Sequence, residues 1–113
     1  MQELEEKTYN YTVQVIGFIK TLEKTFPHLV SAEFREIAGN VSLKFMDALD
    51  SIENKDFSDN IRKSHEYATR SFEILKSINC SENKDLEKQK AQLLLDSHEI
   101  IEKLNLIINK LIY

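Results

Sequence analysis

Apolar side chains recur at alternating spacings of three and four residues through almost the whole chain, in four runs separated by short polar breaks. This period places one apolar stripe along each of four amphipathic helices. Only two glycines and one proline occur among 113 residues, too few for the many tight turns that a β-sandwich or β-barrel needs. The pattern therefore predicts an all-α fold in a single domain, residues 1–113.

The helices are expected at roughly 2–26, 31–52, 55–79 and 83–112. Pro27 ends the first, because proline disfavours helical geometry at the residue before it. The expected N-caps of the later helices are Ser31, then Asn54 or Asp56, then Ser81 or Asn83. Loops of a few residues force neighbouring helices to run antiparallel, which predicts an up-down-up-down four-helix bundle.

The four stripes predict the core, and they run from Leu4 to Leu22, Phe34 to Ile52, Phe57 to Ile78 and Leu86 to Leu111. Further apolar residues lie beside the stripes of the first, second and fourth helices. Such surplus is typical of a second packed surface, although the apolar face of an ordinary globular helix can also be this wide. We therefore predict a self-association interface formed by Tyr9, Val13, Ile16, Leu43, Met46, Leu94, Ile101 and Ile108.

Signatures of catalysis are missing from the sequence. Neither His65 nor His98 follows a glutamate by three residues, as the di-iron bundles require. Gly17 and Gly39 stand alone within helices and form no phosphate loop, so we assign them to close helix approach. Cys80, the single cysteine, lies in a polar loop without a neighbouring histidine. We expect no enzymatic activity, no cofactor, no metal and no small-molecule substrate.

The net charge of −4 argues against electrostatic binding of nucleic acid by the protein surface as a whole, and only the third helix has a positive net charge. Two small basic clusters remain candidates for phosphate contact: Arg62, Lys63 and Arg70, and Lys84, Lys88 and Lys90. Mixed charges at three- and four-residue spacing more often form a solvated face. The sequence has no signal-peptide pattern and no run of 18 apolar residues, which predicts a cytoplasmic protein without a membrane partner.

Residues 7–16 follow the pattern aromatic, polar, aromatic, small, valine, polar, aliphatic pair, and similar agreement is found at Phe26–Pro27, at Arg35 with Val41–Ser42, and at 55–57. In these features the chain resembles the bacterial four-helix bundle proteins known as 23S rRNA-intervening-sequence or S23-type proteins. Relatives carry a Pro-x-Asn-Ile-Ala-Glu-Gly-like stretch after the Val-Ser, which residues 43–50 lack. Whatever role that stretch has in the relatives therefore cannot be assigned to this chain.

The resemblance implies a bundle that assembles into a ring, commonly a homopentamer. A related protein is the accessory variability determinant of diversity-generating retroelements, which partners a reverse transcriptase and its RNA and looks strongly basic. We therefore predict a non-catalytic homo-oligomeric scaffold or interaction module. The alternative is an accessory protein that binds RNA, DNA or a nucleic-acid enzyme through the basic clusters.

Overall fold

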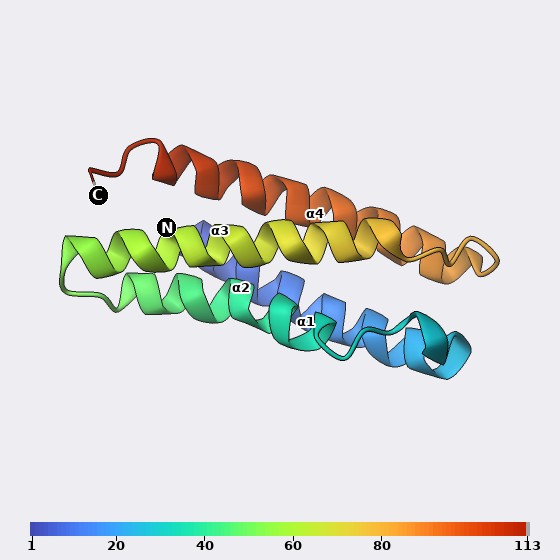
Figure 1. Cartoon of the computed structure of the whole chain (residues 1–113). Coiled ribbons are helices and arrows are strands. Elements are labelled where there is room, and N and C mark those ends of the chain that lie inside the picture. The colour runs from blue at the N-terminus through green and yellow to red at the C-terminus, as the bar shows by residue number, and fades with distance from the viewer. Residues whose placement is uncertain (113) are drawn as a thin grey trace.

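The computed structural model describes residues 1–112 and consists of four long α-helices and one short 3-10 helix (Figure 1). The elements are α1 (Gln2–Thr25), η1 (Pro27–Leu29), α2 (Phe34–Leu49), α3 (Asn54–Ser77) and α4 (Lys84–Ile108). The all-α class and the four helices predicted from the sequence are confirmed. The bundle is elongated, with extents of 47 × 21 × 21 Å.

The helices occupy the corners of a square in chain order. Each packs against its neighbours in sequence and α4 returns to α1, whereas the diagonal pairs have no close backbone approach within residues 1–112. Cross-helix contacts run in opposite directions along paired helices, as with Glu3 to Lys103 and Lys7 to Glu99 between α1 and α4. Both termini therefore lie at the end of the bundle where α3 begins (Figure 1).

The predicted stripes form the core along most of their length. All six stripe positions of α1 from Leu4 to Leu22 are buried, and buried stripe residues continue through the other helices to Leu104. Small hydroxyl residues fill the positions where large side chains do not fit between the helices. Ser64 donates to the carbonyl of Val41 at 2.7 Å, and this bond satisfies its buried hydroxyl.

The ends of the helices differ from the sequence prediction, most of all in α2. That helix starts three residues after Ser31, whose hydroxyl accepts from the Glu33 amide in a turn rather than capping the helix. It ends at Leu49, so Ile52 leaves the stripe and is 98% exposed instead of buried. α4 ends at Ile108, four residues early.

The predicted caps also differ in outcome. Asn83 caps α4 by accepting a hydrogen bond from the Leu86 amide at 3.0 Å, as one of the two alternatives. α3 starts after Glu53 and has no side-chain cap, so neither Asn54 nor Asp56 acts as its N-cap. The sequence analysis assigned Gly17 and Gly39 to places where two helices approach closely. This is wrong for the helices of one chain, because no atom beyond the glycine's own stretch of helix lies within 4 Å of a Cβ built at either position.

Candidate functional site

The outer side of the α1–α2 pair carries the most conspicuous exposed apolar surface on the helices. Four of the predicted interface residues are between 42% and 59% exposed there, and we call them the α1–α2 stripe: Tyr9, Val13, Leu43 and Met46. Ile16 extends the stripe and is half-buried. Large hydrophobic side chains this exposed and grouped on adjacent helices are typical of a surface that binds a partner.

The register of the two helices brings these residues to one face. The Thr12 hydroxyl donates to the carbonyl of Ala38 at 3.1 Å and fixes the level at which α1 and α2 meet. Tyr9 precedes Thr12 by three residues. Leu43 and Met46 follow Ala38 by about one and two turns of an antiparallel helix, so they lie toward the level of Tyr9. Residues far apart in sequence are therefore brought toward the same face of the bundle.

The three interface candidates on α4 are placed differently. Leu94, Ile101 and Ile108 are partly buried and pack against the chain's own core, so a smaller part of each is available to a partner. Their side of α4 faces α3, and the core between the two helices takes up the extra apolar width. The large hydrophobic residues of α4 that are exposed are Leu95 and Leu106, at 65% and 62%.

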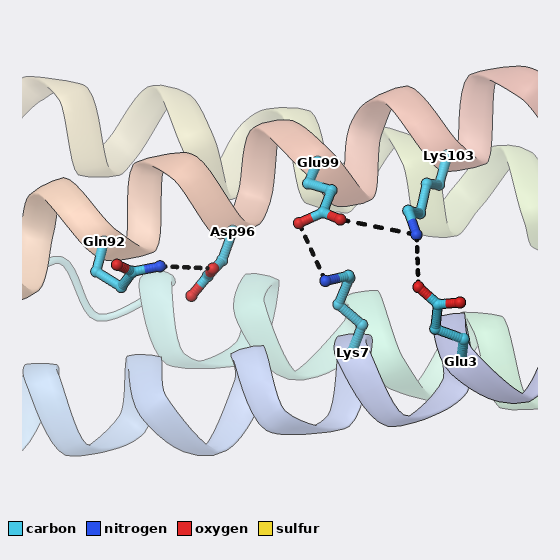
Figure 2. Close-up of polar contacts among 6 residues, drawn as sticks. All are labelled: Glu3, Lys7, Gln92, Asp96, Glu99 and Lys103. Carbon is cyan, nitrogen blue, oxygen red and sulfur yellow. Dashed lines mark hydrogen bonds and ion pairs between the residues drawn. The ribbon is translucent and has the colours of Figure 1, made fainter.

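The boundary between α1 and α4 is polar instead (Figure 2). Lys7 Nζ lies 3.0 Å from Glu99 Oε2, and Lys103 Nζ lies 2.8 Å from Glu3 Oε1 and 3.7 Å from Glu99 Oε1. The hydrogen bond from Lys103 lowers the pKa of Glu3, and the one from Lys7 lowers the pKa of Glu99. This chain of alternating charges links the two helices over the first turns of α1.

The basic candidates of α3 are exposed but accompanied by acids. Arg62 and Lys63 both lie close enough to Asp59 to lower the pKa of its carboxyl group, after the larger effect of the Lys55 hydrogen bond. The guanidinium of Arg70 lies 5.6 Å from the centre of the Tyr67 ring. These contacts are those of a solvated helix face with mixed charge.

The second basic cluster lies at the opposite end of the bundle from the termini. Lys84 and Lys88 are exposed in the first turns of α4. Lys90 is half-buried, and its ammonium donates to the carbonyl of Ile78 at 2.6 Å, just past the end of α3. Its charge therefore serves the α3–α4 connection, a role that the sequence pattern did not indicate.

The histidines and the cysteine lie apart from one another in the described part of the chain. No group of three or more His, Cys, Asp or Glu in residues 1–112 could hold a metal ion. His98 pairs with Glu102 at 2.9 Å on the surface of α4. Cys80 is buried rather than exposed in its loop, and this burial, together with the Glu87 carboxylate, raises the pKa of its thiol. A raised pKa disfavours the thiolate that a nucleophile requires.

The fold and this surface together define an all-α four-helix bundle with one exposed apolar stripe. No helix within residues 1–112 has both the length and the apolar character that crossing a membrane requires. Comparisons with protein-family models, with curated proteins and with solved structures found no match. The resemblance to S23-type proteins therefore stays a prediction.

Proposed function

We propose that this protein is a non-catalytic scaffold or interaction module that self-assembles through the α1–α2 stripe. The observation that carries the proposal is the grouping of Tyr9, Val13, Leu43 and Met46 on one face with 42% or more of each side chain exposed. Covering such surface removes apolar area from water, which is the main favourable contribution to protein association.

A second copy of the chain is well suited to cover the stripe. An interface across a twofold axis is self-complementary, because the same patch serves both subunits. The stripe consists of two antiparallel helices with two large residues from each. In such a pair the α1 half of the stripe packs against the α2 half of the second copy, so that apolar side chains cover apolar side chains.

A closed ring, as the S23 resemblance implies, needs two different surfaces on each subunit. The exposed Leu95 and Leu106 on α4 are the candidates for the second. The two arrangements differ in their response to Leu95→Lys. This substitution leaves a twofold pair intact, whereas it breaks a ring into smaller species. Native mass spectrometry of the wild type and of the Leu95→Lys variant counts the subunits in each.

Size-exclusion chromatography with light scattering, over a range of concentrations, tests the proposal. The wild type is expected to exceed the monomer mass of 13.2 kDa, and the double variant Val13→Lys with Leu43→Lys to elute as a monomer. Thr21→Lys is the matched control, since Thr21 is exposed on α1 but lies beside Gln89 and Leu93 of α4, away from the stripe. A monomeric wild type, or an assembled double variant, contradicts self-assembly.

Binding of nucleic acid by the assembled protein is the alternative. Its candidate contacts are the exposed Arg62, Lys63, Arg70, Lys84 and Lys88, which symmetry would repeat around an oligomer. Filter binding to structured RNA at low and at moderate salt tests it, because affinity through phosphate contacts falls steeply with salt. Absence of binding at low salt removes this alternative and leaves the scaffold proposal standing.

A further inference from the structure

A cavity of about 660 Å³ opens at the end of the bundle where both termini lie. It lies between the start of α1 and the end of α4, above the first turn of α3. Most of its wall is apolar and consists of Met1, Leu4, Phe57, Leu106, Ile107 and Leu111. Small-molecule sites are typically concave, mostly apolar and roughly 300–1,000 Å³ in volume, so this cavity has the size of a ligand site.

The wall also carries three ionisable side chains, Glu3, Lys103 and Lys110. Glu3 and Lys103 are paired with each other at 2.8 Å, so their charges offset. Lys110 has no ion-pair partner among residues 1–112 and follows α4 in a turn closed by its own amide and the carbonyl of Ile107. The cavity therefore combines an apolar interior with a lysine ammonium that has no ion-pair partner in the described part of the chain, and the N-terminal residue Met1 also lies in its wall.

A second, smaller cavity of about 220 Å³ adjoins the first and shares Phe57, Lys110 and Leu111 with it. Asn54 and Ser58, from the first turns of α3, line its other side. Lys110 thus lies where the two cavities meet. The N-terminal end of α3 also lies here, but its first turn contains the negatively charged Asp56, which disfavours an anion. The anchor for an anion is therefore the Lys110 ammonium and not the helix end.

We propose that this cavity binds a free single-chain alkyl carboxylate, such as a medium- or long-chain fatty acid. The alkyl chain lies against Leu4, Phe57 and Ile107, and the carboxylate accepts hydrogen bonds from the Lys110 ammonium. The site is separate from the α1–α2 stripe, so it does not depend on pairing through that stripe, whereas a ring contact at Leu106 would cover part of the cavity wall. Glu3 and Lys103 are engaged with each other in the wall, and the proposed role of the site is binding alone.

Isothermal titration calorimetry with saturated carboxylates of increasing length, each kept below its micelle concentration, tests the apolar part of the site. The affinity is expected to rise about fourfold for each added methylene until the cavity is filled. The alkyltrimethylammonium of equal length is expected to bind more weakly because it meets Lys110 as a like charge. Absence of carboxylate binding, or equal affinity for both head groups, overturns the proposal.

Two exposed leucines of α4 provide a matched pair of variants. Leu106 lines the cavity, whereas Leu95 is equally exposed and lies outside it. Leu106→Ser is expected to weaken carboxylate binding about tenfold, and Leu95→Ser to leave it unchanged. Lys110→Glu is expected to reverse the preference between carboxylate and ammonium. Equal losses in the two leucine variants identify binding to exposed apolar surface in general and contradict a defined site.

Nuclear magnetic resonance shifts locate the ligand. Shifts are expected at Leu4, Phe57 and Ile107, and shifts centred on Tyr9 and Leu43 instead assign the alkyl chain to the stripe and overturn the proposal. Co-sedimentation with phosphatidylglycerol vesicles separates a free carboxylate from a membrane lipid. The protein is expected to stay in the supernatant, and sedimentation with the vesicles contradicts a site for a single free chain.

Discussion

The hydroxyl of Tyr11 on α1 and that of Ser71 on α3 form a hydrogen bond of 2.5 Å across the diagonal of the bundle. Both residues are buried, and the backbones of α1 and α3 have no close approach in the part of the chain that the structure describes. Burial raises the pKa of the tyrosine to about 12, and the Ser71 and Ser97 hydroxyls oppose that rise. The bond therefore ties opposite corners of the bundle through its centre.

Tyr11→Phe removes this bond and leaves the Ser71 hydroxyl buried with one partner fewer. The expected cost is about 1–3 kcal/mol in the free energy of unfolding, since a buried polar group that loses its partner keeps its desolvation penalty. Urea unfolding followed by circular dichroism measures it. The double variant Tyr11→Phe with Ser71→Ala is expected to lose less than the sum of the two single variants, because both remove the same bond. Additive losses contradict the coupling.

His65 on α3 is half-buried, and its Nε2 atom is buried without a hydrogen-bond partner. Burial lowers the pKa of this histidine below its ordinary value of 6.5, because the charged imidazolium loses water. The folded state thus binds a proton less readily than the unfolded chain. Stability is expected to be full above about pH 6.5 and to decline as the pH falls through that value toward the folded pKa.

His65→Gln removes this proton linkage, so its urea midpoint is expected to change less than that of the wild type between about pH 8 and about pH 5.5. His28→Gln, at an exposed position in η1, is the control for the loss of a surface histidine. If His65→Gln and the wild type lose stability in parallel over this range, the buried imidazole is not the source of the pH dependence.

The ion pairs between α1 and α4 predict a separate response to acid. Lys7 and Lys103 hold the pKa of Glu99 below its ordinary value of 4.5, so the carboxylate favours the folded state above that pH and loses this effect as the pH falls. Glu99→Gln is expected to flatten the fall in melting temperature between about pH 6 and about pH 3.5. Glu66→Gln, an exposed acid of α3, is expected to follow the wild type. Parallel curves for all three proteins contradict this account.

The sequence predicted the interior of the helices well and their ends less well. Alternating spacings of three and four are set by helix geometry, so positions such as Val15, Phe45 and Ile100 could be assigned to the core from the pattern alone. The pattern continues to Ile52, but the chain has to turn into α3, and that turn exposes it. Turns depend on tertiary connections that local periodicity does not contain.

The candidate surface was predictable in part for a similar reason. Tyr9 and Leu43 lie far enough around their helices to escape the core, and the structure leaves them exposed. Leu94 and Ile101 have a comparable offset, but they turn toward α3 and are partly covered. Which side of a wide apolar face meets a neighbour depends on helix rotation. The cavity at Lys110 escaped the sequence analysis altogether, because it is formed by the ends of three different helices.

The two glycines allow stability and assembly to be tested separately. Both lie inside helices, where alanine is favoured over glycine by about 0.5–1 kcal/mol, and a Cβ at either meets no atom within 4 Å. Gly17→Ala and Gly39→Ala are therefore each expected to raise the free energy of unfolding by about that amount in urea titrations at low protein concentration. Destabilisation by either substitution contradicts the open space around it.

Their effects on self-assembly are expected to differ. Gly39 precedes Leu43 by four residues and Met46 by seven, so on α2 it lies on the same face as the stripe, whereas Gly17 lies beside Gln92 and Leu93 of α4. If a second copy covers the stripe as proposed, it meets the α2 backbone near Gly39, and an added methyl group there would hold the subunits apart. Sedimentation equilibrium is expected to show weaker association for Gly39→Ala than for Gly17→Ala, although both fold more stably. Equal association constants would mean that the stripe is not where the subunits meet at close range.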